Sequence, residues 1–584
     1  MDSTYSPTPR GIRSTPLSRR AWLQAAAGLG SCVALGPARA AEAPADQESL
    51  IRAALPKQAP ARPAKARRLL IFDLNVNYGG HPSIRTANRA FALMGEKTGA
   101  FETVVSQDPE VFRPDSHRRF DAVFFNNTVG NCFTDPVLRQ SLADFVYGGG
   151  GLMGVHGTTV GFTQWPGAKE DWPEFGLMIG ARGANHRASD ERVVLALDEP
   201  DHPVNAVFGR RGFEFRDEFF RVGDPYSRQR LRVLLSIDKE KTDLDQGTAR
   251  GRVERADRDY ALAWVRNYGR GRTFYCTIAH NPYVFWDARL LEFYLAATQF
   301  VLGDLPAPTI PSARLTPAIR AQERLGWRLG VEAYTFHRFP LFEAIEKTAR
   351  LGLAYMGGLS FQKVGGDIPR NFEPGLSDDE IRQVRFKLDA AGVRLLTYYI
   401  QDIPGEEAAC RRIFEFGRKI GIETFMTEPK PEALPLIARF CDEYDIRVAL
   451  HNHDAKGSPV YWQPEGILRA CDGLTHRIGA CADLGYWMRA GIDPIEGVRK
   501  LGDRLVTVQV HDLDARTPQG QDVPWGTGTG KTAEFIRELH RAKRLPVMFG
   551  LEYSRNFENS LPEVTRCVEF FDRLALQVEA EGRP

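Results

Sequence analysis

The sequence predicts an α/β protein of two domains, a doubly wound domain followed by a (β/α)₈ barrel. Short apolar runs alternate with helical stretches along most of the chain, which is typical of parallel sheets covered by helices. This alternation is interrupted at 305–311, where three prolines in seven residues indicate a stiff connector. The 584 residues are also too many for a single hydrophobic core.

Residues 1–40 have the features of an export signal. Arg19 and Arg20 form a twin-arginine pair, an apolar run follows over 21–35, and Ala38-Arg39-Ala40 is a small-x-small cleavage site. The alternative is a chance arginine pair in a tail. The apolar run is shorter than the roughly 20 residues that span a bilayer. We therefore expect export by the twin-arginine route, to the periplasm or cell exterior, and no membrane association after signal cleavage.

Composition excludes several classes of protein. The chain is 43% hydrophobic and 26% charged, with a net charge of +2. Residues 1–40 hold five arginines and one aspartate, so signal removal changes this charge to −2. Such a balance does not favour a nucleic-acid surface. The seven cysteines beyond the signal include no CxxC pair and do not form a disulfide framework.

The first block of strand and helix patterns spans 67–304. It follows an Ala- and Pro-rich segment at 41–66 that we interpret as a linker. Strands alternating with helices predict a mostly parallel sheet with helices on both faces. The expected strands are 69–74, 103–106, 122–125, 151–156, 192–197, 232–237, 261–266 and 272–277.

A second block spans 326–580, after a Pro-rich linker at 305–325. Eight strand–helix units in roughly 250 residues match the size of a (β/α)₈ barrel. An open doubly wound sheet is the structural alternative. The expected strands are 329–336, 354–359, 394–400, 424–428, 447–453, 478–483, 506–511 and 547–553.

Polar residues follow the apolar runs of this second block, where the catalytic end of such a barrel lies. One strand-end histidine alone is more often structural, but four polar ends on successive strands indicate a metal site. Mixed nitrogen and oxygen ligands suit Zn²⁺, Mn²⁺, Co²⁺ or Fe²⁺ rather than Ca²⁺, and Mg²⁺ is a further candidate. The strand-end residues are Glu332, Glu428, His451, His453, Asp483, His511 and Glu552.

Residues 326–575 resemble the xylose isomerase-like, sugar phosphate isomerase/epimerase barrels. The resemblance is carried by A-L-H-N-H-D (449–454), C-A-D-L-G-Y-W (481–487), V-Q-V-H-D-L (508–513), P-W-G-T-G (524–528) and G-L-E-Y (550–553). It implies that His451, Asp483, His511 and Glu552 hold one divalent metal ion.

Two positions depart from this family pattern. Many of its epimerases have a glutamate where His451 stands, and many members have a histidine where Tyr486 stands. The two-glutamate mechanism of those epimerases therefore does not carry over. Glu428 and His453 become the candidate acid and base groups, together with Glu552.

Residues 67–304 resemble the ThuA-like (trehalose utilisation) family, which has a class I glutamine amidotransferase-like, flavodoxin-like doubly wound fold. The matching segments are Gly80-His81-Pro82, His186, Asp201-His202-Pro203, Arg216–Phe219 and Gly269–His280. The segment 148–159 lacks the Cys or Ser of a nucleophile elbow. The resemblance implies a sugar-related role, with His156, Glu218 and His280 near one pocket. A binding module without chemistry is the alternative.

Together these features predict an exported, metal-dependent enzyme of the sugar isomerase/epimerase type. It would remove the proton alpha to a carbonyl of a carbohydrate, and the ThuA-like half favours keto-glycosides. One alternative is β-elimination or hydrolysis of a keto-glycoside at the same site. Others are a phosphodiesterase of the endonuclease IV type and a non-catalytic carbohydrate-binding protein. The expected partner is a small-molecule carbohydrate, with no nucleic acid; no oligomeric state is predicted.

Overall fold

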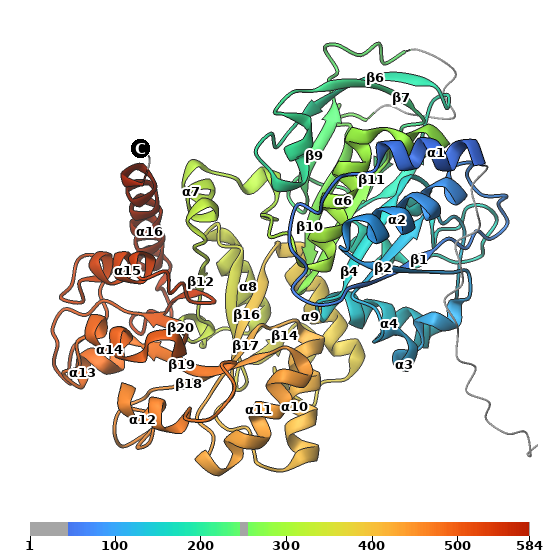
Figure 1. Ribbon diagram of the computed structural model, residues 1–584. Helices are drawn as coiled ribbons and strands as arrows, with labels where there is room; N and C mark the ends of the chain where they lie inside the picture. The colour runs from blue at the N-terminus through green and yellow to red at the C-terminus, as the bar shows by residue number, and fades with distance from the viewer. Residues whose placement is uncertain (1–44, 246–254, 583–584) are drawn as a thin grey trace, which may run out of the picture. The chain divides into compact units, whose positions relative to one another are not determined.

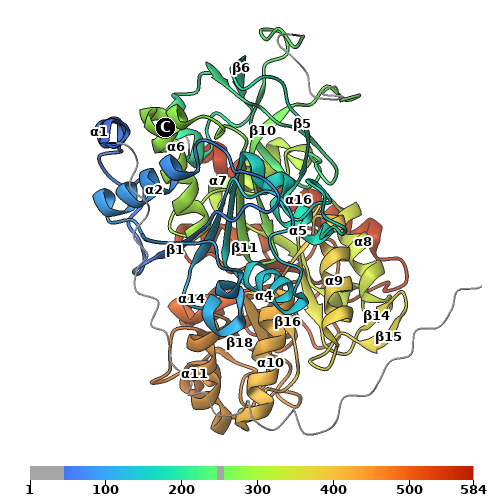
Figure 2. The ribbon, with the colours of Figure 1, turned by 90° about the vertical axis from the view of Figure 1, so that its right-hand side faces the viewer.

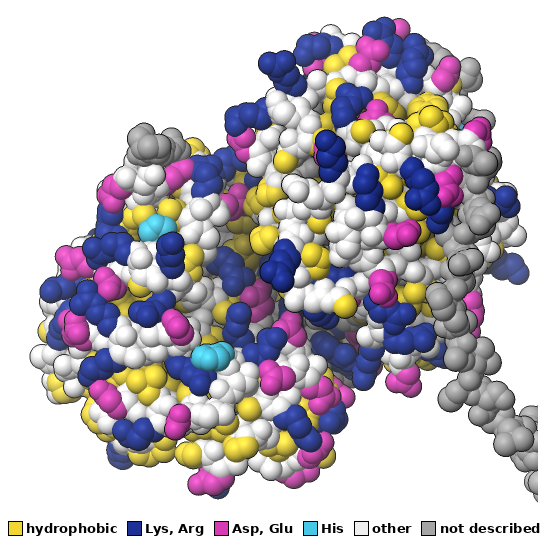
Figure 3. Space-filling view, viewed as in Figure 1, with side chains coloured by type: hydrophobic (Ala, Val, Ile, Leu, Met, Phe, Trp, Pro, Cys, Tyr) yellow, Lys and Arg dark blue, Asp and Glu magenta, His cyan; other side chains and the backbone are white. Residues whose placement is uncertain are grey.

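The computed structural model describes residues 45–245 and 255–582 (Figure 1). The export signal expected at 1–40 lies outside the described residues. On the face drawn in Figure 3, Lys and Arg side chains are interspersed with Asp and Glu. Within the described ranges, no helix is both long and apolar enough to cross a membrane.

The N-terminal domain is built on a nine-stranded sheet in the order β2-β1-β3-β4-β11-β10-β9-β6-β7. The strands from β2 to β11 pair in parallel, whereas β11, β10, β9, β6 and β7 pair antiparallel in succession. Its strands are β1 (Arg68–Phe72), β2 (Glu102–Ser106), β3 (Ala122–Asn126), β4 (Gly151–Val155), β6 (Glu191–Leu197), β7 (Phe213–Asp217), β9 (Arg232–Ile237), β10 (Ala261–Tyr268) and β11 (Gly271–Cys276).

Every strand expected in this domain is present. The expectation of a mostly parallel sheet holds for one half of it only, because the second half is an antiparallel extension. Strand β7 and a small ribbon of β5 (Arg182–Asn185) and β8 (Arg221–Gly223) were not anticipated.

Helices cover both faces of the parallel half. Successive side chains of a strand point to opposite faces. Accordingly, Leu69 and Ile71 of β1 belong to one buried cluster, and Leu70 and Phe72 to another. Figure 2 shows α2 (Ile84–Thr98) and α6 (Ala288–Leu302) on one side of the sheet and α4 (Pro136–Tyr147) and α5 (Pro173–Ile179) on the other. The doubly wound prediction is confirmed here. A short helix, α3 (Pro114–His117), precedes β3.

The segment 41–66 differs from the expected linker. It contains α1 (Ala45–Ala54), whose Ile51 is buried in the same cluster as α2 and α6. The Gln299 side chain also accepts from the backbone N–H of Ala61 and donates to its carbonyl. This segment therefore packs against the first domain.

The segment 305–325 likewise contains a helix, α7 (Pro317–Leu325). It packs against α16 (Leu561–Glu581) of the barrel, and Gln322 donates a 2.6 Å hydrogen bond to Asp572. This helix contacts both domains, because Arg320 and Glu323 also form ion pairs with Glu199 and Arg232 of the first domain.

The second domain is a closed parallel barrel of eight strands, as predicted. The first expected strand is shorter, because residues 333–336 form a 3₁₀ turn. The strands are β12 (Leu329–Val331), β13 (Tyr355–Leu359), β16 (Arg394–Tyr399), β17 (Thr424–Thr427), β18 (Arg447–His451), β19 (Ile478–Asp483), β20 (Leu505–Val510) and β21 (Phe549–Leu551). A hairpin of β14 (Lys363–Gly365) and β15 (Ile368–Asn371) follows β13.

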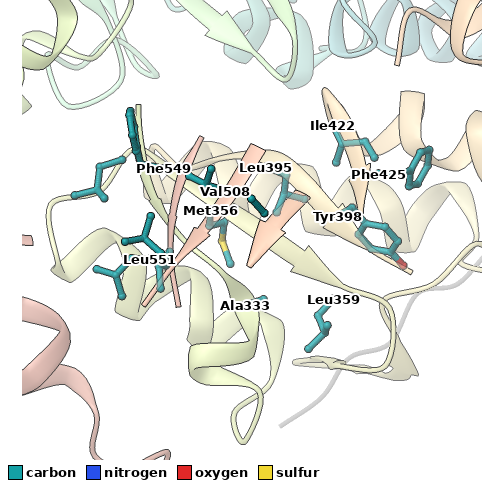
Figure 4. Close-up of a cluster of buried hydrophobic side chains, with 14 of the residues drawn as sticks. Ala333, Met356, Leu359, Leu395, Tyr398, Ile422, Phe425, Val508, Phe549 and Leu551 are labelled. Atoms are coloured by element: carbon teal, nitrogen blue, oxygen red, sulfur yellow. The ribbon is translucent and has the colours of Figure 1, made fainter. Parts of the chain in front are cut away.

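Helices surround the barrel and bury its outer face. The strands and helices share one large cluster of buried hydrophobic side chains. Figure 4 shows four of its members, Met356, Leu395, Val508 and Phe549, which come from four different strands. The helices are α8 (Leu341–Arg350), α9 (Asp378–Ala391), α10 (Glu407–Ile420), α11 (Leu434–Tyr444), α12 (Pro464–Ala470), α13 (Leu484–Arg489), α14 (Pro494–Leu501), α15 (Thr532–Arg541) and α16.

All seven cysteines beyond the signal are buried and unpaired. Burial raises the pKa of the Cys132 and Cys276 thiols of the first domain to about 12. The barrel contains the other five: Cys410, Cys441, Cys471, Cys481 and Cys567.

Candidate functional site

Strand periodicity places the polar strand ends inside the barrel mouth. Met426 of β17, Ala449 of β18 and Cys481 of β19 belong to the small apolar cluster that fills the barrel interior. A residue two positions further along a strand faces the same side. Those residues are Glu428, His451 and Asp483.

Asp483, His511 and Glu552 form one group of potential metal ligands, with one ligand atom from each within 4.8 Å of the others. His511 Nε2 lies 3.5 Å from Asp483 Oδ2 and 3.9 Å from Glu552 Oε1. The other ring nitrogen, Nδ1, donates to Asp522 Oδ1 at 2.7 Å. This bond turns Nε2 toward the other two ligands, where it is buried without a hydrogen-bond partner.

Glu428, His451 and His453 form a second group. His453 Nδ1 lies 2.7 Å from Glu428 Oε1, and the Tyr399 hydroxyl donates to the same oxygen at 3.0 Å. His451 Nδ1 is 3.5 Å from it. Burial acts against ionisation, but the His451 and His453 imidazoles lower the pKa of Glu428 to about 2. Glu428 is therefore a carboxylate at neutral pH.

The structure thus divides the four residues that the sequence assigned to one metal. Three stand together, while His451 groups with Glu428 and His453. His451 Nε2 is nevertheless 3.7 Å from Asp483 Oδ2, and it hydrogen-bonds to the side-chain oxygen of Gln509. The Gln509 amide donates in turn to Glu552 at 2.8 Å. Gln509 therefore links the two groups.

Sequence reasoning missed both Gln509 and Asp522. Gln509 is a long polar side chain in a strand that is otherwise apolar except for Thr507, which is the signal that could have identified it. Asp522 lies in the long loop after β20, where no periodic pattern indicates which side chain returns to the site. Its carboxylate is nevertheless almost fully buried, and it also accepts from Arg489 at 3.1 Å.

Glu332, at the end of β12, is a buried carboxyl group that is protonated at neutral pH. Burial first, and then the charge of Glu552, raise the pKa of Glu332 to about 8. Two glycines make room for it, because a Cβ at Gly357 or Gly550 would lie 2.0 or 2.5 Å from its oxygens. The Thr397 hydroxyl donates to it at 3.3 Å. Burial likewise raises the pKa of Glu552 to about 7.

Members of both groups line a pocket at the barrel mouth, together with Glu332 and Gln509, whereas His511 stands outside its lining. Among its described lining residues there is no lysine or arginine. Four aromatic side chains form much of its wall: Tyr334, Phe361, Tyr399 and Tyr486. His453 lines the pocket and packs edge-to-face against Tyr486, with ring centroids 4.8 Å apart. Glu428 is not among the lining residues.

The three residues expected near one pocket of the first domain are also brought together. His156 Nε2 and His280 Nε2 lie 3.4 and 3.9 Å from Glu218 Oε1. The structure adds His81, whose ligand atom lies within 4.8 Å of those of the other three residues. His186 Nδ1 is 3.0 Å from the second oxygen of Glu218.

Comparisons with known proteins agree with this architecture. A ThuA model, described as trehalose utilisation, matches residues 68–301, and a model described as xylose isomerase-like TIM barrel matches residues 345–566. No curated protein matches the chain.

Three solved structures are among those similar to the chain. A protein of Parabacteroides distasonis is 30% identical over 42% of this chain and 98% of its own, with a TM-score of 0.36. A ThuA-like protein of Bacteroides uniformis is 19% identical over 41% and 94%, with a TM-score of 0.34. A D-tagatose 3-epimerase-like protein is 16% identical over 42% and 98%, with a TM-score of 0.34. The two family models therefore identify a ThuA domain followed by a xylose isomerase-like TIM barrel in this chain.

Proposed function

We propose that the barrel is a metal-dependent enzyme that removes the proton alpha to the carbonyl of an uncharged sugar or keto-glycoside, as an isomerase or epimerase. The observation that carries the proposal is that members of both groups of polar side chains line one pocket. A trio of potential metal ligands lies beside an imidazole–carboxylate pair, and the pocket wall is aromatic.

The residues present fit a divalent metal ion. Donor atoms about 2.1 Å from one ion are roughly 3.0–3.4 Å apart. His511 Nε2 lies 3.5 and 3.9 Å from the Asp483 and Glu552 oxygens, slightly further than in an occupied site. Because Nδ1 of His511 is bonded to Asp522, its unpartnered Nε2 is the ring nitrogen available to a metal. His451 is the fourth candidate ligand. When bound, the ion supplies Lewis-acid polarisation of the sugar carbonyl and its neighbouring hydroxyl.

His453 is the proposed general base. It lines the pocket, whereas Glu428 stands behind it and accepts from Nδ1, so that Nε2 is the nitrogen left to take a proton. The Tyr399 hydroxyl fixes the Glu428 carboxylate. This arrangement favours Glu428 as the positioning group and His453 as the base.

The pocket favours an uncharged substrate. A phosphate group is normally held by arginine or lysine, and none is among the described lining residues. Aromatic side chains instead provide flat apolar surfaces for the faces of a sugar ring. A sugar or keto-glycoside without phosphate is therefore the proposed substrate class.

β-Elimination from a keto-glycoside is the second candidate reaction. It begins with the same proton removal, and then requires an acid to protonate the departing oxygen. Glu332, protonated at neutral pH, lines the same pocket as His453. This observation keeps elimination as the alternative outcome at one site.

Solvent-deuterium exchange tests the proposal. The full-length protein, loaded with Mn²⁺, Co²⁺ or Zn²⁺, is incubated in D₂O with keto-sugars, keto-glycosides and their phosphates. We expect deuterium alpha to the carbonyl of uncharged substrates, and a free aglycone if elimination follows. His453→Gln should lower the exchange rate by about 10²–10⁴-fold, the usual contribution of a general base.

His476→Gln is the matched control, because His476 is an exposed histidine of the same domain. It should keep wild-type exchange. Exchange by His453→Gln within twofold of the wild type would refute the assignment of the base. Turnover of sugar phosphates alone would refute the substrate class.

A further inference from the structure

The first domain contains its own convergence of metal-binding side chains. His156 follows β4, Glu218 follows β7, His280 lies just beyond β11, and His81 precedes α2. Strands β4 and β11 are parallel neighbours, and four successive antiparallel pairings return β7 to the same direction. All three strands therefore end at one edge of the sheet, where ligands bind in open α/β folds.

Asp217, the last residue of β7, fixes the neighbouring Glu218 relative to His280. Its fully buried carboxylate accepts the backbone N–H groups of His280 and Asn281, each at 3.0 Å. Glu218 is therefore positioned by the sheet and not by a mobile loop. His186 holds the second oxygen of Glu218 at 3.0 Å.

His156 occupies the turn at which related folds place a catalytic nucleophile. It lies between the end of a buried strand and Gly157, with a φ of +42°, the left-handed conformation of a nucleophile elbow. Its Nδ1–H donates to the Thr277 carbonyl at 2.9 Å. Nε2 is consequently a lone-pair nitrogen, fully buried and without a hydrogen-bond partner.

The three imidazole rings of this cluster lie close to one another. The imidazole centroids of His81, His156 and His280 are separated by 4.8 to 5.5 Å. A Cβ at residue 157 would lie 2.6 Å from the His81 ring, so only glycine there leaves space for it. His81 Nδ1 and His280 Nδ1 are also buried without hydrogen-bond partners. Burying such an unpartnered nitrogen is unfavourable unless something binds it.

The donor set suits a cation. Three imidazoles and one carboxylate offer ligand atoms that lie within 4.8 Å of one another. Imidazole and carboxylate are the donors of Zn²⁺ and related ions.

We propose that the ThuA domain holds a second divalent transition-metal ion, bound by His81, His156, Glu218 and His280. The site lies at the elbow where related folds place a nucleophile, and a bound ion would supply Lewis-acid chemistry there. This site is independent of the ligand group in the barrel.

The ligand class follows from the neighbouring surface. The Tyr78 ring lies 5.1 Å from that of His81 and 5.8 Å from that of Trp165, which is 52% exposed. The side chains of His186 and His280 remain partly open to solvent. An aromatic pair beside a near-surface metal suits a sugar, whose ring stacks while its hydroxyls reach the ion.

Metal stoichiometry of the full-length protein tests the proposal. After loading with Zn²⁺ and dialysis, we expect two ions per chain. Glu218→Gln and His156→Asn should each lower the content by one, Asp483→Asn should lower it by one from the barrel, and Glu218→Gln with Asp483→Asn should leave none. Thermal unfolding checks that each variant is folded.

His117→Gln is the matched control. His117 is another buried histidine of this domain with an unpartnered Nε2, but it stacks on Phe145 and belongs to none of the ligand groups. It should keep both ions. X-ray absorption at the zinc edge of Asp483→Asn should show three imidazole nitrogens and a carboxylate around the remaining ion.

The proposal is overturned if Glu218→Gln and His156→Asn, both folded, keep wild-type metal content. It is also overturned if Asp483→Asn removes every ion. A barrel that binds no metal while the first domain does would instead contradict the proposed function alone.

Discussion

Asp522→Asn should weaken metal binding at the barrel mouth without removing a ligand. Asp522 is almost fully buried and accepts from His511 Nδ1 at 2.7 Å. Asparagine keeps the size of the side chain but loses the charge that orients the imidazole and increases its basicity. Carboxylates in this position contribute about 10–100-fold to metal affinity. The expected loss is therefore about 1.4–2.7 kcal/mol of binding free energy.

Competition with a fluorescent chelator measures this loss. The measurement is made on Glu218→Gln protein, so that only the barrel site is titrated. Asp493→Asn is the control, because Asp493 is a partly exposed helix cap in the same domain. It should keep the parent affinity. Affinity of Asp522→Asn within twofold of that parent would show that the Asp522–His511 bond does not tune a metal ligand.

Three further results are expected. His117 is buried with its pKa lowered to about 3, whereas an unfolded histidine titrates near 6.5, so the unfolded state gains the proton first and stability falls as pH drops through this window. Between pH 7 and pH 5, the free energy of unfolding measured in urea should fall by about 2 kcal/mol less in His117→Phe than in the wild type. An equal fall in both proteins would contradict this. Gly357→Ala should displace Glu332 and abolish turnover, whereas Gly79→Ala, with open space around it, should not. We also propose twin-arginine export, and changing both Arg19 and Arg20 to lysine should retain unprocessed protein in the cytoplasm; unaltered processing would contradict it.

Local patterns predicted most of the fold. Each expected strand of both domains is present, because strands and helices differ in the periodicity of apolar residues over short stretches of sequence. Such local patterns do not determine which strands pair. The alternating Phe213–Asp217 could have been recognised as a strand, but its antiparallel addition to the sheet edge depends on tertiary contacts. The helix at 45–54 was missed because few apolar residues anchor it.

In the candidate sites, too, the residues at strand ends were predictable from the sequence, whereas the residues on loops were not. Strand ends converge at one edge of a sheet or barrel, so His451, Asp483 and His511 could be placed near one another from sequence. Whether His451 stands with Asp483 or with Glu428 depends on separations of about 3.5 Å, which no strand pattern sets. Asp522 and His81 reach their sites along loops, and the paths of loops are not periodic.

The buried cysteines give each domain a separate chemical reporter. A thiol that is buried and whose pKa is raised reacts with alkylating reagents only when the surrounding structure opens. Cys132 and Cys276 report on the ThuA domain, whereas Cys441 and Cys567 report on the barrel. Labelling rates under native conditions, resolved by peptide mass, therefore yield the opening free energy of each half within the intact chain.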